Sequence, residues 1–474
     1  MSSPINQRPG QDEARRSPNQ DEPRFSLGSN MSRPRGGLGE VWELAYPAIL
    51  SQVSVTAMGV VDSAMVGRLG ATELASVGFG GIWIWTLFCG FYGMAAVVQT
   101  FVAQDHGADR ARQSGAWTWQ GAWLLTPLAA VLAFVLLFAS TPLLALLTPS
   151  PSMQSIASEY ISIRAVGAVG MCLASVFLSF YRGIGDTRTP LAITVFVNIL
   201  NVVLDYGLIF GRMGLPEWGV AGAATATVIA EWATALITIG LFLGPNLRKK
   251  FGTRPVRPRW KDQLRLLRIG LPLGGQALLE MGSFALFLTF VAWMGENSMA
   301  ASQAFVSLLS MTFMQAVGIG YAVATLVGRY RGGNDIAAAR RSFASSQKLA
   351  AGLSVGIGLI FIVFPDPLMR IFTTDPEVIA LGRTLLLIGA FYEVMDAFSI
   401  VTDGALRGAG DTRAPFVARL LLAWGVQVPL AWLFGIYWEG GVAGAWLGSG
   451  VYMLTLSLYL WIRFRSDAWQ RIKI

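Results

Sequence analysis

The chain has 474 residues, of which 54% are hydrophobic and only 14% are charged, with a mean hydropathy of +0.53 and a formal net charge of +8. A soluble domain carries about 25% charged residues, so this composition excludes a water-soluble surface. The basic residues lie in short loops between apolar segments, which argues against nucleic-acid binding and for a membrane protein.

The first 36 residues are polar and rich in Pro, Gln, Arg, Asp and Ser, which predicts a disordered cytoplasmic tail over residues 1–36. Beyond it, apolar runs alternate with charged or Gly- and Pro-rich breaks. A membrane-spanning helix needs about 20 apolar residues. Twelve segments qualify: residues 40–67, 74–104, 115–140, 158–181, 189–211, 219–244, 265–294, 299–329, 342–364, 378–405, 414–436 and 441–464.

Positive charges favour one of the two sets of loops between these segments. Arginines and lysines gather in alternate loops and at the C-terminus, whereas the opposite loops offer Arg68, Arg212 and Arg370. The positive-inside rule then places both termini in the cytoplasm, which agrees with an even number of spans. We expect a multi-pass protein of a cell membrane, with a bacterial inner membrane as the best-fitting location.

Two loops have nearly the same sequence. Arg-Gly-Ile-Gly-Asp-Thr-Arg-Thr-Pro occupies residues 182–190, and Arg-Gly-Ala-Gly-Asp-Thr-Arg-Ala-Pro occupies residues 407–415, an offset of 225. The same offset relates Pro47 to Pro272. Several matches at one offset along the whole chain indicate an internal duplication.

Each half of the duplication contains six spans and therefore enters the membrane in the same orientation. The sequence predicts an all-α integral membrane protein, with twelve transmembrane helices in two six-helix lobes related by a pseudo-two-fold axis along the membrane normal. The expected N-lobe is residues 37–244 and the expected C-lobe is residues 265–464. A cytoplasmic linker, 245–264, joins them, and a cytoplasmic tail, 465–474, follows. Rocking of two such lobes opens a cleft alternately to each side, as in secondary transporters.

Ionisable residues inside the N-lobe spans form the first candidate site. A charge at the bilayer centre costs at least about 2.5 kcal/mol, so it marks a cavity or a partner. Asn198, Asn201 and Asp205 share one face of the fifth span, and Asp62 lies in the first. Their oxygens suit a hard cation such as Na⁺, and a carboxylate cluster suits proton carriage. A Na⁺ at Asp62, Asn201 and Asp205 is the one metal site that this pattern allows.

A second acidic set lies in the C-lobe spans. Tyr392 and Asp396 are one helical turn apart in the tenth span, and Glu280 is near the middle of the seventh. At the offset of 225, Asp396 aligns with Met171, so the two lobes are not equivalent in their acids. We expect the scaffold to be duplicated and ion coupling to be asymmetric.

Two methionines of the first span, Met58 and Met65, are tentative contacts for a substrate, since Met adapts to ligands of varied shape. Plain helix packing is the simpler explanation for both. Nothing in the sequence predicts a bound cofactor, and H⁺ or Na⁺ is expected as the coupling ion.

These motifs resemble those of the multidrug and toxic compound extrusion (MATE) family. They are the segment from Pro47 to Asp62-Ser-Ala-Met-Val-Gly, the two duplicated loops, and Gly219-Val-Ala-Gly-Ala-Ala-Thr-Ala-Thr227. The resemblance covers about residues 38–465. It implies the MATE fold and an antiporter that exports organic, often cationic, xenobiotics in exchange for H⁺ or Na⁺ by alternating access.

The resemblance also implies roles for individual residues. DinF-like and archaeal members use an Asp of the first helix, an Asn-x-x-x-Asp pair of the fifth and a Thr of the sixth. NorM-like members use a Glu eight residues after the Pro of the seventh helix, and Tyr-x-x-x-Asp on the tenth. The matching positions are Asp62, Asn201, Asp205 and Thr227 in the N-lobe, and Glu280, Tyr392 and Asp396 in the C-lobe. The chain thus combines DinF-like and NorM-like features, and the N-lobe set is the tighter local cluster.

Other function classes fit less well. A flippase for a lipid-linked or other amphipathic metabolite shares the two-lobe plan, but the mid-span charges here are mostly acidic, which favours a cationic substrate. An enzyme is not expected, because the sequence lacks a His-Glu-x-x-His motif and a nucleophile with a nearby base. A channel is not expected either, since the halves differ at their acids. The expected partners are small-molecule drugs or metabolites and the lipid bilayer, with no nucleic acid, and the protein is expected to be a monomer.

Overall fold

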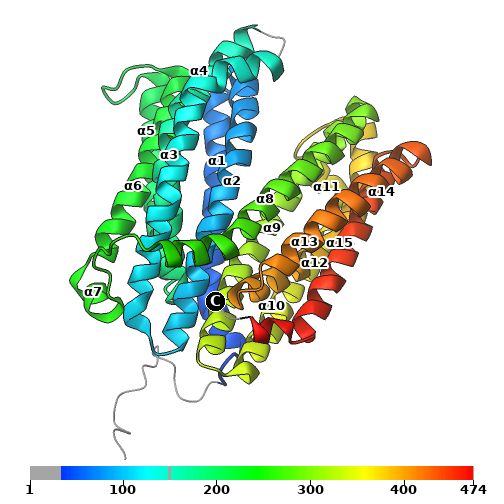
Figure 1. The fold of residues 1–474 in the computed structure, drawn as a ribbon. Coiled ribbons are helices and arrows are strands. Elements are labelled where there is room, and N and C mark those ends of the chain that lie inside the picture. The colour runs from blue at the N-terminus through cyan, green and yellow to red at the C-terminus, as the bar shows by residue number, and fades with distance from the viewer. Residues whose placement is uncertain (1–33, 148–150, 473–474) are drawn as a thin grey trace, which may run out of the picture. The chain divides into compact units, whose positions relative to one another are not determined.

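The computed structural model describes residues 34–147 and 151–472, so the predicted tail lies almost wholly outside the described residues. Within them, twelve helices are long and apolar enough to cross a membrane, and the predicted twelve-span, all-α fold is confirmed. Eleven are continuous (Figure 1): α1 Leu38–Val66, α2 Ala71–Gly107, α3 Ser114–Leu147, α4 Pro151–Gly183, α5 Arg188–Phe210, α6 Gly219–Phe242, α8 Trp260–Trp293, α9 Glu296–Gly332, α10 Ile336–Val363, α12 Pro376–Gly408 and α15 Gly441–Arg465.

The remaining span, Arg413–Tyr437, is interrupted. It consists of α13 (Arg413–Leu422), a π-helical turn η2 (Ala423–Gln427), α14 (Val428–Trp432) and a second π turn η3 (Leu433–Tyr437). Pro429 lies inside it and has no backbone N–H to donate. Wider π turns re-form the hydrogen bonds around such a residue, and they are frequent at functional sites.

Large apolar side chains remain exposed along the spans. On α3, Val131, Phe134 and Phe138 are more than 60% exposed, and on α5 the same holds for Ile199. A soluble protein buries such residues, whereas a membrane protein presents them to lipid. The exposed apolar surface therefore agrees with the hydropathy of the spans.

The two duplicated loops fold identically. Gly185 and Gly410 adopt left-handed backbone angles, with φ of 84° and 83°, which only glycine adopts without strain. In the first loop Asp186 N donates to Tyr181 O, and in the second Asp411 N donates to the equivalent Leu406 O. The same helix-ending bonds thus recur 225 residues apart, as the repeat predicts.

We refer to α1–α6 as the N-lobe and to α8–α15 as the C-lobe. The lobes meet where α1 and α2 pack on α8 and α9. A Cβ built on Gly107 would lie 1.7 Å from the Arg329 carbonyl oxygen, and one on the equivalent Gly332 would lie 2.0 Å from that of Gln104. Glycine is therefore required on both sides, because only it lets the two backbones approach this closely.

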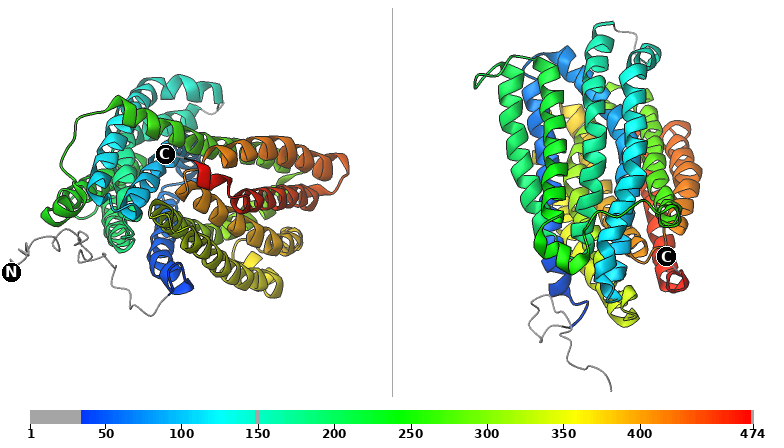
Figure 2. Two further views of the ribbon diagram at one scale, coloured as in Figure 1. Left: turned by 60° about the horizontal axis from the view of Figure 1, so that its bottom comes forward. Right: turned by 60° about the vertical axis from the view of Figure 1, so that its left-hand side comes forward.

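The linker between the lobes is fastened to the outside of α3 (Figure 2). It contains the short helix α7, Pro245–Phe251, and then runs extended to the first turn of α8. The indole N–H groups of Trp119 and Trp123 donate to the carbonyls of Thr253 and Val256, at 3.1 and 2.9 Å. The predicted linker, 245–264, therefore includes helical turns, since charged residues are tolerated where a spanning helix leaves the bilayer.

The C-terminal end is also packed. After α15, the short turn η4 (Ala468–Arg471) buries Trp469 completely, with its ring stacked 5.1 Å from that of Phe464. The described part of the predicted tail, residues 465–472, is thus held against the C-lobe.

Candidate functional site

The N-lobe brings three of the sequence-predicted residues together. The Asn201 side-chain amide donates to Asp205 Oδ2 at 3.1 Å, within α5. The carboxyl group of Asp62, on α1, lies next to that of Asp205. Two carboxylates this close repel each other when both are ionised, and a proton or a bound cation relieves that repulsion. The cluster of Asp62, Asn201 and Asp205 is thus a carboxyl pair suited to take up a cation.

The carboxyl pair keeps unused ligand capacity. Asp205 is fully buried, and its Oδ1 and the Oδ1 of Asp62 are buried atoms without a hydrogen-bond partner. Buried polar atoms without partners are costly and call for an explanation such as an ion or a water. Two free carboxyl oxygens beside the Asn201 amide supply the ligand type that a hard monovalent cation uses.

A buried ion pair lies beside this cluster. Arg164, on α4, donates from Nη2 to Glu231 Oε1, on α6, at 2.8 Å, and the two side chains are 10% and 16% exposed. Arg164 is within electrostatic range of Asp62, and its Nη1 is a buried atom without a partner. Because the guanidinium is committed to Glu231, the Asp62–Asp205 pair has no arginine hydrogen-bonded to it in the described structure.

The other predicted N-lobe residues occupy different surroundings. Asn198 donates from Nδ2 to the backbone carbonyl and the hydroxyl of Ser54, at 2.9 and 2.8 Å, and so ties α5 to α1. The Thr227 hydroxyl donates to the carbonyl of Ala223 in its own helix. Met58 is buried in the core, and Met65 packs against a small apolar cluster around Val66. Their roles toward ion or substrate stay predictions.

In the C-lobe, Glu280 has a partner that sequence reasoning missed. Arg419, on α13, donates from Nη1 to Glu280 Oε1 at 2.8 Å. The arginine side chain is 5% exposed, whereas that of Glu280 is 40% exposed. The guanidinium therefore reaches Glu280 from the interior of the lobe, and the carboxylate lies at the lobe's accessible edge.

The remaining C-lobe acids lie on α12. Asp396 is buried and within electrostatic range of Arg419 and Glu280. Glu393 Oε2 accepts the hydroxyl of Thr312 at 2.6 Å, which ties α12 to α9. The ring of Tyr392 meets Trp446 edge-on, with centroids 5.9 Å apart. The structure thus gathers Glu280 and Asp396 around one arginine, with Tyr392 packed next to them.

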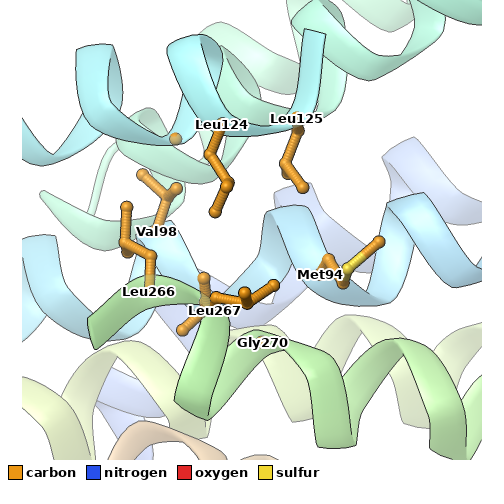
Figure 3. A pocket seen from close by; sticks show the side chains of 9 residues that line it. Met94, Val98, Leu124, Leu125, Leu266, Leu267 and Gly270 are labelled. Atoms are coloured by element: carbon orange, nitrogen blue, oxygen red, sulfur yellow. The ribbon is translucent and has the colours of Figure 1, made fainter. Parts of the chain in front are cut away.

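Figure 3 shows a small pocket between α2, α3 and α8. Its nine lining residues are all apolar, among them Met94, Leu125 and Leu266. It contains none of the ionisable groups described above, so it offers packing space and no charge recognition.

The two arginines of these ion pairs could have been recognised from the sequence. Both lie well inside apolar spans, Arg164 in α4 and Arg419 in α13. A buried guanidinium at that depth requires an acidic partner. Searching each lobe for a mid-span Glu would have suggested Glu231 and Glu280, although the pairing itself needs the helix packing.

Comparison with known proteins agrees with this architecture. A family model described as MatE matches residues 47–207 and 272–433, one segment in each repeat. The probable multidrug resistance protein NorM of Thermotoga maritima is 30% identical over 438 residues, which is 91% of this chain and 93% of that protein. Multidrug resistance protein PmpM of Pseudomonas aeruginosa is 28% identical over 446 residues, 92% of this chain and 93% of that protein.

Solved structures share the fold at low sequence identity. A crystal structure of a MATE protein in complex with MaL6 has a TM-score of 0.84 at 20% identity, covering 93% of this chain and 98% of that one. The eukaryotic MATE transporter AtDTX14 has a TM-score of 0.80 at 19% identity, covering 91% and 96%. At this identity the likeness establishes the fold.

Fold and site together define a twelve-span membrane protein with an internal repeat and buried ionisable groups in both lobes. The chain belongs to the MatE family.

Proposed function

We propose that this protein is a secondary active multidrug antiporter, which exports organic, often cationic, compounds in exchange for H⁺ or Na⁺ by alternating access. The observation that carries the proposal is the Asp62–Asp205 carboxyl pair, in which the Oδ1 atom of each residue is buried without a hydrogen-bond partner and no arginine is bonded to the pair. A group that takes up and releases a cation must not be permanently neutralised, and this pair meets that condition.

Exchange follows if the two states of the lobes bind the cation differently. A ligand shifts an equilibrium between two conformations only by its differential affinity for them. Asp62 is on α1 and Asp205 is on α5, so any shift of one helix against the other changes the pair directly. Binding of H⁺ or Na⁺ to the pair therefore favours the conformation in which α1 and α5 hold the two carboxyl groups side by side.

Several further points support export of drugs. The curated relatives are named multidrug resistance proteins. Among the described residues of the C-lobe, the buried acids Glu393, Asp396, Asp403 and Asp411 outnumber the buried arginine Arg419, which favours cationic substrates. By the positive-inside rule, the basic loops favour a cytoplasmic position for both termini, and we propose that the protein acts as a monomer.

The test is transport by the purified protein in liposomes, with ethidium as substrate. Under an imposed proton or Na⁺ gradient, wild-type protein should move ethidium against its gradient, and Asp62→Asn and Asp205→Asn should each abolish that movement. The matched control is Asp366→Asn, which removes a carboxylate of the short helix α11, Pro365–Met369, that pairs with Arg383 on α12.

The outcomes separate the alternatives. Removing Na⁺ at constant pH distinguishes the two coupling ions. Full gradient-driven transport in both aspartate variants would refute the N-lobe assignment. Absence of coupled transport in wild-type protein, together with movement of a fluorescent lipid between leaflets, would favour a flippase.

A further inference from the structure

The pairing of Glu280 with Arg419 leaves the C-lobe electrostatically different from the N-lobe. In the N-lobe, the arginine is committed to Glu231, away from the carboxyl pair. In the C-lobe, the arginine is bonded to Glu280 itself, the residue that the sequence predicts to bind the cation.

The arginine is positioned among several acids, not beside one. Besides its bond to Glu280, Arg419 is within electrostatic range of Asp396 and Asp403, both on α12, and of Tyr452 on α15. The side-chain amide of Gln276 donates to Asp403 Oδ1 at 3.3 Å. One guanidinium thus sits where carboxylates of α8 and α12 converge, which is where a cation bound between these helices would lie.

Packing on both sides of Glu280 holds the arginine in this place. The Phe416 ring lies against Gly275, with Cε2 3.0 Å from where a Cβ would be, and the Trp424 ring lies against Gly282 at 3.4 Å. These two contacts pack α13 and η2 onto α8, three residues before and five residues after Arg419. Helix packing therefore fixes the distance between the backbones that carry Arg419 and Glu280.

A guanidinium in this position excludes a second cation. It keeps its charge at any physiological pH and cannot leave, because it is part of the chain. Two unit charges 4 Å apart repel by about 4 kcal/mol at an effective dielectric of 20. A free Na⁺ at Glu280 would face that repulsion and would find the carboxylate already neutralised.

We propose that Arg419 is a tethered cation that fills the cation position of the C-lobe, so that the free coupling ion binds in the N-lobe alone. The proposal rests on the proposed function only in naming Asp62 and Asp205 as the other site. Removing the guanidinium should then uncover a dormant Na⁺ site at Glu280.

The test measures ²²Na⁺ binding to the purified full-length protein in detergent. Asp62→Asn serves as the background, since it removes the N-lobe site and leaves only the C-lobe to be observed. In this background Arg419→Met should raise Na⁺ binding from none to one ion per protein. Adding Glu280→Gln should abolish the gained ion, and Arg419→Lys, which keeps a tethered charge, should not produce it.

Two results would overturn the proposal. One is a folded Asp62→Asn/Arg419→Met protein, with an unchanged melting temperature, that binds no Na⁺. The other needs no change at Arg419: Na⁺ binding by Asp62→Asn protein that Glu280→Gln removes would show that a free ion already occupies the C-lobe. Neither readout requires transport, so a failed antiport assay would leave this test intact.

Discussion

Thr100 and Thr325 occupy equivalent positions of the two repeats and make the same bond across the lobe interface. The Thr100 hydroxyl donates to the backbone carbonyl of Arg407 at 3.0 Å, and the Thr325 hydroxyl donates to that of Arg182 at 2.8 Å. Both acceptors are the first residues of the duplicated loops. The lobes are therefore joined here by a two-fold pair of hydrogen bonds.

Breaking either bond should loosen this interface. Thr100→Val and Thr325→Val each remove a buried hydrogen bond worth about 1 kcal/mol, which changes the ratio of joined to separated lobes by roughly fivefold. Spin labels at Arg188 and Arg413, exposed and equivalent in the two lobes, should show a new longer-distance component in electron paramagnetic resonance. Thr118→Val is the control, since its hydroxyl bonds within its own helix, and an unchanged distance distribution in both test variants would contradict the expectation.

The close backbone approach at Gly107 should tolerate no side chain. Gly107→Ala places a methyl group 1.7 Å from the Arg329 carbonyl oxygen, and both partners are backbone. We expect the variant to insert but to lose the joined arrangement of the lobes, and with it most ethidium transport. Gly356→Ala is the matched control, because no atom lies within 4 Å of a Cβ there. Equal transport by both variants would show that the lobes need not meet at this point.

The Arg164–Glu231 pair should be asymmetric in its response to mutation. Arg164→Met leaves a buried carboxylate without its partner, a change that costs about 3–5 kcal/mol. Glu231→Gln should cost less, because a neutral amide still accepts the guanidinium bond. The double variant Arg164→Met/Glu231→Gln should recover stability relative to Arg164→Met, measured by equilibrium unfolding in mixed detergent. Additive losses in the double variant would argue that the two side chains act independently.

Two asparagines of α5 should separate into a structural and a site residue. Asn198→Ala removes two bonds to Ser54 on α1, so it should lower the melting temperature while the ion dependence of transport persists. Asn201→Ala removes the donor to Asp205, so it should impair coupling with a smaller change in melting temperature. The opposite pattern would move Asn198 into the ion site.

Hydropathy and the repeat were enough to predict the spans, because bilayer thickness sets the length of an apolar segment and a duplicated loop must fold twice. The sequence analysis does not predict the interruption of the span around Pro429. The π turns beside this residue depend on how the helix packs around the backbone N–H that proline lacks. The predicted spans 265–294 and 342–364 start later than α8 and α10 do, because Lys261 and Arg340 interrupt the apolar run although both lie inside the helices.

The site was predicted in part, for the same physical reasons. Asn201 and Asp205 are one turn apart in sequence, so their contact follows from helix geometry alone. The contact of Asp62 with Asp205 is predicted from the free-energy cost of a charged side chain inside the bilayer, and it also requires that α1 and α5 pack together, as they do. The pairing of Glu280 with Arg419 joins residues 139 positions apart, and no local pattern encodes such a distance.

The paired threonine bonds have a consequence for assembly. Each repeat carries both halves of the joint, a donor hydroxyl on α2 or α9 and an acceptor carbonyl on α4 or α12. Such a surface is isologous, and a chain of half this length would present a face complementary to itself, as the subunits of a symmetric dimer do. The linker between the lobes, which is bonded to α3, makes this association intramolecular. The two threonine hydrogen bonds therefore form independently of protein concentration, and the sequences of the two halves can diverge.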